Sequence, residues 1–464
     1  MKAAWAFVLT MISICGVGAE TLTLEQAREL ALAHSKDLAK YNLTISNSQL
    51  AEQADFFSKY LPTLSASASA STNLWNVSSA DSAGSASSSN SVLYDGLKVS
   101  GTLTAQERIT LYDGGSSRIA SEIRAISNET TRIQALEAYF SVLSDADNAY
   151  YAVLQAQAAL AAAELSLENA DLGLAIAEVR LETGLISAGD YLKALIEKET
   201  QENGRNQARR DLSLKQTQFQ NLVGLAGSQE LEPVNFDAYE NALQTLASLS
   251  DADIDALYTS LWKSVESSNP GLSRSALSYQ QAGKNLESAQ SKYLPTVTAT
   301  ASATAGLNWS PSIESFTTST NGNVSLNVSI PLDIWVTANS VAQQKNNLSS
   351  ANLSYEASRE STAISLMSAL YTVVQQASAV LSSRRSYELS QQNYDYTMER
   401  YKLSQSSTAD LTNASLTLTT SHNALNNAQF NFLKSLSAIR TLGAFEEESV
   451  IIDMALRSKG AAVR

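Results

Sequence analysis

The chain carries one pattern twice, and this duplication limits its possible folds more than any other feature of the sequence. The segment Lys59–Thr63 (KYLPT) recurs 233 positions later as Lys292–Thr296. The stretch Arg180–Asp190 has a counterpart 220 positions later, at Arg400–Asp410. Repetition in both sequence and spacing predicts two copies of one unit, rather than the roughly three ordinary domains that a chain of this length could form.

The two copies define the expected domain organisation. Each begins with a helix that leads into a β-hairpin, and a long helical hairpin follows. We predict a cleaved leader at 1–19; a first repeat at 20–230, with its β-hairpin at about 62–112 and its helical hairpin at 113–226; a linker at 231–253; a second repeat at 254–442, with its β-hairpin at about 295–332 and its helical hairpin at 333–441; and a tail at 443–464.

The segments after the two KYLPT motifs alternate strictly between apolar and small polar residues. Pro62 and Pro295 end the preceding helices, because proline lacks an amide hydrogen and disfavours helix before it. A period of two indicates strands with one apolar face and one Ser/Thr face. The apolar positions are Leu64, Ala66, Ala68, Ala70, Leu74, Leu97, Val99, Leu103, Ala105, Ile109 and Leu111 in the first copy, and Val297, Ala299, Ala301, Ala303, Val324, Leu326, Val328, Ile330 and Leu332 in the second.

Strands of this kind suit a water-filled transmembrane barrel. Residues 62–75 extend about 46 Å at about 3.3 Å per residue, which is more than a bilayer core requires. Trp75, Trp309 and Trp335 lie in or beside the strands, as expected for aromatic residues at a membrane interface. A soluble sandwich is the alternative, but about 180 residues of helix-like sequence separate the two strand pairs.

The number of strands predicts an oligomer. An open sheet edge is not tolerated in lipid, and the smallest closed membrane barrels have about eight strands. One chain supplies four, so several chains must contribute to one barrel. Strand counting alone does not decide between a dimer and a trimer.

The segments between the strand pairs predict long helices. Residues 116–183 contain no proline and a single glycine, Gly173, and residues 336–403 contain neither. Without a break, 68 residues would reach about 100 Å. Short interruptions at 183–185 and 404–406 precede returning helices at 187–224 and 407–440. A soluble coiled-coil scaffold would also fit these helices, but it does not explain the alternating strands.

The N-terminus resembles a secretory leader. Lys2 precedes an apolar run at 3–14 that is too short for a membrane anchor, and Val17-Gly18-Ala19 is a small-residue cleavage pattern. We expect cleavage after Ala19. Lipidation of Cys15 is the alternative, although Ile14 stands where a lipoprotein leader has a small residue.

Composition weighs against enzymes and nucleic-acid binding. Cys15 is the only cysteine, and His34 and His422 are the only histidines, so neither a Cys-based nor a multi-His metal site is expected. The net charge of −14 would repel phosphates. We find no phosphate-binding loop, nucleotide fingerprint or catalytic triad, and we predict no enzymatic activity and no cofactor.

Taken together, these motifs resemble the outer membrane efflux protein family, the TolC-like channel-tunnels. The segment Leu22–Leu38 is similar to the entry motif of that family, and the two YLPT turns are similar to its helix-to-strand transitions. Leu111–Gly115 resembles its strand-to-helix transition, and Arg180–Asp190 and Arg400–Asp410 resemble its helical hairpin tips. The resemblance covers nearly the whole chain after the leader.

The resemblance implies an α+β membrane protein that assembles as a homotrimer. Each chain would give four strands to a twelve-stranded β-barrel in the outer membrane, and a coiled-coil barrel of helices would extend into the periplasm. The implied function is an export duct of a tripartite efflux or type I secretion system. Its partners would be a periplasmic adaptor (membrane fusion) protein and an inner-membrane transporter of the RND, ABC or MFS type. A non-transporting envelope scaffold is the alternative function.

The resemblance also implies a gate at the hairpin tips. Asp190 and Asp410 match the family's tip aspartates, and Tyr401 matches a gating aromatic. Ser406 stands where well-known members have an arginine, and Asn413 stands where they have a second aspartate, so the Tyr/Arg/Asp lock of the family is incomplete here. Helix capping is the structural alternative for the two aspartates, and both roles can hold together.

Overall fold

The computed structural model describes residues 21–61, 63–72, 97–225, 227, 229–310, 315–446, 452 and 454. The leader with Cys15, the helix-ending Pro62 and the interfacial Trp75 lie outside these residues. The described chain divides into two compact units. A helical body contains the residues up to Tyr41, Ile133–Ser275 and the residues from Tyr355 onwards, and a sheet unit contains Asn42–Arg132 and Ala276–Ser354. Each unit therefore takes segments from both sequence repeats.

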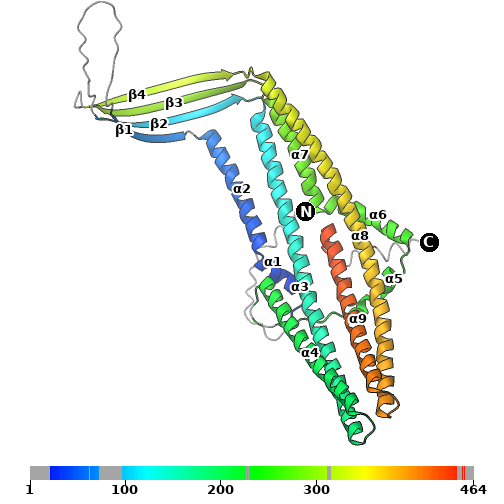
Figure 1. The fold of residues 1–464 in the computed structure, drawn as a ribbon. Helices are drawn as coiled ribbons and strands as arrows, with labels where there is room; N and C mark the ends of the chain where they lie inside the picture. Colours follow the sequence, from blue (N-terminus) through cyan, green and yellow to red (C-terminus); the bar gives the residue numbers. More distant parts are fainter. Residues whose placement is uncertain are drawn as a thin grey trace, which may run out of the picture. The chain divides into compact units, whose positions relative to one another are not determined.

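Helices and pairs of strands follow the same order in both halves of the chain (Figure 1). The first half contains α1 (Leu24–His34), α2 (Lys36–Tyr60), β1 (Thr63–Thr72), β2 (Leu97–Tyr112), α3 (Ser116–Glu182) and α4 (Ala188–Val223). The turn η1 (Phe236–Tyr239) and α5 (Glu240–Ala247) lead to α6 (Asp251–Ser268), α7 (Pro270–Ser291), β3 (Thr296–Ser310), β4 (Ser315–Ser329), α8 (Ile334–Lys402) and α9 (Thr408–Gly443). This order confirms the predicted internal duplication.

The copies agree in the detail of their helix boundaries. Ser35, between α1 and α2, has φ −63° and ψ 115°, and Asn269, between α6 and α7, has φ −64° and ψ 118°. Each side chain accepts a hydrogen bond from the amide three residues later, from Leu38 at 3.3 Å and from Leu272 at 2.7 Å. Equivalent residues therefore cap the helix that leads into each strand pair.

The four strands form one antiparallel sheet in the order β1-β2-β3-β4 (Figure 1). Its register places apolar residues opposite apolar ones: Ala105 pairs with Leu64 of β1 and with Ala303 of β3. The alternate rows are polar, and the hydroxyl of Ser67 lies 2.6 Å from that of Thr102. The apolar side is exposed in the single chain, Leu64 by 75% and Val324 by 82%. The sheet thus has the two contrasting faces that the alternation predicts.

The last strand is shorter than its alternating sequence suggests. β4 ends at Ser329, so Ile330 and Leu332 lie beyond it. Pro331 explains this, because proline cannot donate to a strand ladder. The apolar rows also continue into polar positions in the first half of β4, at Thr318 and Thr320.

The joints between sheet and helices are built from the two recurring motifs. The carboxylate of Asp113 accepts hydrogen bonds from the amides of Gly115 at 2.9 Å and Ser117 at 2.7 Å, which fixes the start of α3. Gly114 has φ +66°, and a Cβ on it would lie 2.8 Å from the Cβ of Leu294. Leu294 immediately precedes Pro295. The strand-to-helix joint of the first copy thus packs against the helix-to-strand joint of the second.

The helical body has an apolar core that includes residues from α1, α3, α4, α8 and α9. α8 is long and apolar enough to cross a membrane by composition, with a mean hydropathy of 1.4 over its most apolar window. Leu366, Leu370 and Val373 of this helix are at most 2% exposed within the core. Packing in the helical body therefore accounts for these apolar residues of α8.

A buried ion cluster joins three helices of this body. Asp147 of α3 is 0% exposed, and its carboxylate accepts from Arg28 of α1, Ser437 of α9 and Arg440 of α9, each at 2.6 Å. A carboxylate with donors on both oxygens is well compensated for its burial. The cluster fixes how α1 and α9 lie against α3.

We predict that Asp147→Ala destabilises the helical body by about 3 kcal/mol, because breaking a buried pair leaves charge that water cannot reach. Thermal or urea unfolding followed by circular dichroism measures the loss. Asp145→Ala is the matched control on the same helix, since Asp145 is exposed, and its effect should stay within about 0.5 kcal/mol. Equal effects of the two substitutions would contradict a special role for the cluster.

Candidate gate at the hairpin tips

The two helical hairpins end in turns of the same geometry. After α3, Gly184 has φ +73°, and the amide of Leu185 donates to the carbonyl of Arg180 at 2.8 Å. After α8, Ser404 has φ +61°, and the amide of Gln405 donates to the carbonyl of Arg400 at 2.8 Å. Both turns are left-handed helix ends of the Schellman type. The second copy builds this turn with a serine where the first has glycine.

The helices that return from the tips begin with matched caps. The hydroxyl of Ser187 accepts from the amide of Asp190 at 3.2 Å, and that of Ser407 accepts from the amide of Asp410 at 3.1 Å. The side chains of both aspartates accept from the same serine hydroxyls, at 2.8 and 2.7 Å. Ser187 and Ser407 are therefore the N-caps of α4 and α9, and the predicted gate aspartates support them, with Asp410 completing a capping box through the amide of Ser407. Capping does not exclude a role in the pore, and their gate role stays a prediction.

The two aspartates differ in the groups that offset their negative charge. Lys193 donates to Asp190 at 3.0 Å, and this bond, followed by the one from Ser187, lowers the pKa of Asp190 below 3.8. Backbone and side-chain bonds from Ser407, and then the hydroxyl of Ser406, lower the pKa of Asp410. Both groups are thus charged at neutral pH. Lys193 is the largest cause at Asp190, whereas attraction by Arg400 is the smallest cause at Asp410, so the charge of Asp410 is the less directly offset of the two.

The remaining predicted gate residues take separate places. The Ser406 hydroxyl donates to Asp410 at 3.2 Å, so this position supports the carboxylate instead of supplying a cation. Asn413 is exposed on α9, where its carbonyl accepts from Thr417 at 2.8 Å. Tyr401 is 0% exposed, and its hydroxyl lies 3.2 Å from that of Thr408. The structure brings Ser406 to Asp410 and holds Tyr401 inside the chain.

Arg180 is the tip residue whose role the sequence did not reveal. Its guanidinium carbon lies 4.6 Å above the centre of the Tyr401 ring, and the residue is 8% exposed. Its Nε and Nη1 have no hydrogen-bond partner among the described residues. A cation over an aromatic face is attracted by about 2 kcal/mol when both are desolvated. Arg180 of the first hairpin therefore contacts Tyr401 of the second, the residue predicted to be a gating aromatic.

This contact is the last of a series between α3 and the second hairpin. Asp147 binds Arg440, Gln155 accepts from Lys434 at 2.9 Å, and the hydroxyl of Ser166 lies 2.7 Å from that of Thr419. Gly173 follows, where a Cβ would lie 3.3 Å from Leu411. α3 and α9 thus run antiparallel in contact from the ion cluster to the tips, and Gly173 permits their close approach.

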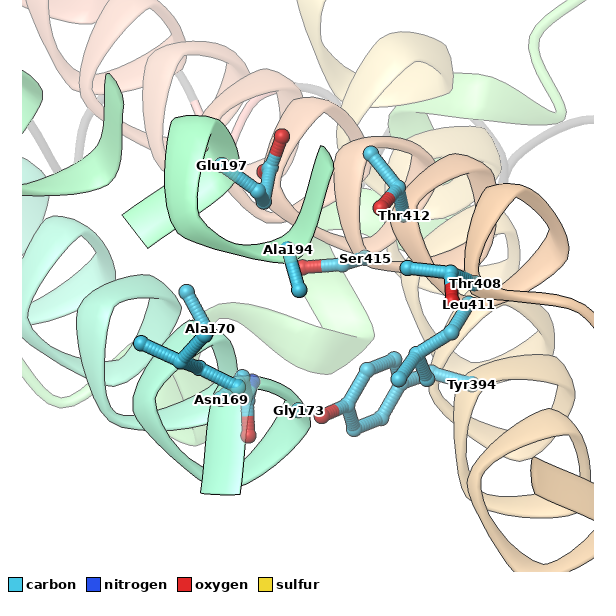
Figure 2. A pocket seen from close by; sticks show the side chains of 11 residues that line it. Asn169, Ala170, Gly173, Ala194, Glu197, Tyr394, Thr408, Leu411, Thr412 and Ser415 are labelled. Atoms are coloured by element: carbon cyan, nitrogen blue, oxygen red, sulfur yellow. The ribbon is translucent and has the colours of Figure 1, made fainter. Parts of the chain in front are cut away.

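A small recess lies between α3, α4, α8 and α9 near Gly173 (Figure 2). Asn169 and Gly173 of α3, Glu197 of α4, Tyr394 of α8 and Thr412 of α9 are among its lining residues. Tyr394 is 6% exposed, and its hydroxyl has no partner among the described residues. Burial, with a smaller effect of Asp395, raises the pKa of Tyr394 to about 12, so the hydroxyl stays neutral.

The predicted turn and interface residues lie in the sheet unit. Pro295 separates α7 from β3, as expected. Trp309 lies near the end of β3, opposite Phe316 of β4. Trp335 is the second residue of α8 and is 69% exposed. Their role at membrane interfaces remains a prediction.

Comparisons with known proteins agree with this arrangement. The model of the outer membrane efflux protein family matches residues 27–227 and 261–443. The chain belongs to this family. It is an outer-membrane efflux channel with a periplasmic helical extension, which confirms the localisation and the export function that the sequence predicted. No curated protein matches the chain significantly.

Solved structures share the fold at low sequence identity. The CusC channel is 15% identical, with 90% of this chain and 91% of that chain covered and a TM-score of 0.70. CmeC from Campylobacter jejuni is 17% identical, with 94% and 89% covered and a TM-score of 0.69. The open state of MtrE from Neisseria gonorrhoeae is 17% identical, with 90% and 88% covered and a TM-score of 0.66. These similarities confirm the predicted fold class.

The left-handed turn residues give a reciprocal prediction. Ser404→Gly should stabilise the second tip, and Gly184→Ser should destabilise the first, each by about 1 kcal/mol, because only glycine adopts this conformation without a Cβ penalty. Hydrogen exchange of the last turns of α8 and α3 measures the effect locally. Changes of the same sign in both tips would contradict the assignment.

The lowered pKa values of Asp190 and Asp410 predict the pH response of the tips. A carboxylate with a depressed folded pKa contributes stability that is complete above its unfolded value near 3.8 and is lost as pH falls through the folded value. Hydrogen exchange at the starts of α4 and α9, corrected for intrinsic rates, should therefore be flat from pH 7 to 5 and accelerate below 3.8. A double Asp190→Ala, Asp410→Ala variant should lack this acceleration, and its persistence there would contradict the assignment.

Proposed function

We propose that three copies of this chain form a continuous export duct through the outer membrane and into the periplasm. The support is the sheet, which has four strands and two unpaired edges, β1 and β4. Joining β1 of one copy to β4 of the next would close a twelve-stranded barrel without exposing backbone to lipid. The apolar face would then meet lipid, and the Ser/Thr/Asn face would line water.

The length of the sheet supports this placement. The apolar row of β3 extends from Val297 to Trp309. These twelve residue steps cover about 41 Å at about 3.4 Å each, or about 30 Å of height at a tilt near 45°. That height matches a hydrocarbon core of about 30 Å. Trp309 and Trp335 would mark the outer and inner membrane interfaces.

The proposed partners follow from the function of an export duct. A passive duct needs a pump, and we propose an inner-membrane transporter of the RND, ABC or MFS type, joined through a periplasmic adaptor protein. Membership of the efflux family supports this assignment. The hairpin tips, with Leu185 60% and Leu403 67% exposed, are the part of the helical body that we assign to this contact.

The tips would also form the gate. Threefold symmetry turns each tip residue into a ring of three, and a carboxylate ring in a pore favours cations. Lys193 offsets Asp190 at 3.0 Å, whereas the hydrogen bonds to Asp410 come from hydroxyl and amide groups of the described residues, and attraction by Arg400 is the smallest cause of its lowered pKa. Asp410 would therefore dominate the field at the aperture, and the Arg180–Tyr401 contact would hold the two hairpins of each chain together.

We predict that Asp410→Ala lowers the K⁺/Cl⁻ permeability ratio of the channel at least about twofold more than Asp190→Ala, because the Lys193 charge already offsets Asp190. Reversal potentials of single channels in planar bilayers, under a KCl gradient, measure the ratio. Conductance of the unmodified trimer in the same experiment tests the duct itself.

Lys193→Ala is the control for this prediction. It should raise cation preference both in a channel that retains Asp190 and in an Asp190→Ala background, because it removes a positive charge from the aperture in each case. Unchanged conductance and unchanged cation preference in both aspartate variants would rule out a gate at the tips. A trimer that never conducts, even with altered tips, would favour the non-transporting scaffold.

A further inference from the structure

Two basic residues of β2 belong to the polar rows of the sheet: Lys98, which pairs with Ser71 near the start of the strand, and Arg108 near its end. Arg108 is the one of the two whose side chain the structure describes. Arg108 of β2 lies in a row with Thr300 of β3 and Ser325 of β4. It is exposed, and no described carboxylate forms an ion pair with it. The polar rows on either side contain only uncharged residues: Gln106, Ser302 and Asn323 on one side, and Thr110, Thr298 and Asn327 on the other. The guanidinium is thus the dominant charge on this part of the face.

The neighbouring residue carries the opposite charge on the opposite face. Glu107 pairs with Ala301, which in turn pairs with Val324, so it belongs to the apolar rows. Its Oε2 is buried and has no hydrogen-bond partner among the described residues. Successive side chains of a strand leave the sheet on opposite sides. The sheet therefore separates Glu107 from Arg108.

We propose that Arg108 sets the charge preference of the barrel lumen, where it would concentrate solutes that carry carboxylate, sulfonate or phosphate groups. The inference rests on the proposed function, because the lumen exists only in the assembled duct. Threefold symmetry makes a ring of three guanidinium groups. Arginine suits this task, since it stays charged at every working pH and binds such anions through two parallel hydrogen bonds.

The size of the barrel shows when this ring would matter. Twelve strands about 4.8 Å apart, tilted about 40°, enclose a backbone diameter of about 24 Å, so the axis lies about 12 Å from each strand. The Debye length is about 30 Å at 10 mM salt and about 3 Å at 1 M. The ring therefore controls the whole cross-section at low salt and very little of it at high salt.

The position of Arg108 in the strand places this ring at the inner mouth of the barrel. β2 ends at Tyr112, four residues further on, and α3 begins at Ser116. Four residues span about 14 Å along a strand. A solute that arrives from the helical part would meet the arginine ring shortly after it enters the barrel.

The test compares reversal potentials of Arg108 variants in planar bilayers, all in an Asp410→Ala background that removes the stronger tip charge. Under a 10 mM to 100 mM KCl gradient, Arg108→Gln should shift the permeability ratio towards K⁺ by about twofold, and Arg108→Glu should shift it further. Arg108→Lys should retain the parent value. At 1 M KCl all four channels should agree.

Glu107→Gln is the matched control, because it removes one charge from the adjacent position on the lipid side and should leave the reversal potential unchanged. An Arg108→Gln channel that conducts with the parent's reversal potential at low salt would overturn the inference while leaving the duct intact. An equal and opposite shift from Glu107→Gln would overturn it too, since the two faces would then not be separated. Absence of conductance in every channel, including the parent, would overturn the duct and the lumen together.

Discussion

The rest of the structure depends on a four-stranded sheet that cannot remain alone in lipid. Its apolar rows, such as Leu64–Ala105–Ala303, need an apolar environment, while its edges at β1 and β4 carry unpaired backbone groups. Each unpaired group in hydrocarbon costs several kcal/mol, so the edges must find partners. Further copies of the same chain supply these partners. The small side chains of the opposite face, mostly Ser, Thr and Asn, then leave a closed barrel open to water.

The same sheet explains why the helices are long and few. A helix precedes each pair of strands and another helix follows it. The joint at Asp113 fixes the start of α3, and the joint at Pro295 fixes the end of α7. α3 follows β2 after the turn at 113–115 and is unbroken for 67 residues, from Ser116 to Glu182 at the first tip. α3 contacts α9 from Asp147 to Gly173, and its Arg180 contacts Tyr401 of α8. These contacts position the second helical hairpin against α3.

The sequence predicts features that depend on the local pattern of residues. It does not reveal contacts between residues that are far apart in the chain. Alternation identified the faces of the strands, and the repeated KYLPT motif located the sheet, because both are written in neighbouring residues. The contact between Arg180 and Tyr401 joins residues far apart in the chain, and periodicity does not say which helices meet. Asp147 looked like any polar helix residue, and only packing shows that it is buried. The end of β4 was overestimated because the alternation runs through Pro331, whose missing donor stops the ladder.

Fixed charges are the feature through which this sequence can make a duct selective for ions and charged solutes. Asp410 at the tips and Arg108 in the barrel have opposite sign, so they cannot favour the same ion. In a path where one follows the other, the narrower and less hydrated constriction dominates the electrostatic barrier. A closed aperture would therefore make the channel appear cation-selective, whatever the barrel contains. In the proposed duct, parting of the tips would move the carboxylates away from the axis, and the arginine ring would become the nearest fixed charge to the solute. The preference measured for a resting channel would then be a property of the proposed gate, and the preference that matters for export would be a property of the barrel.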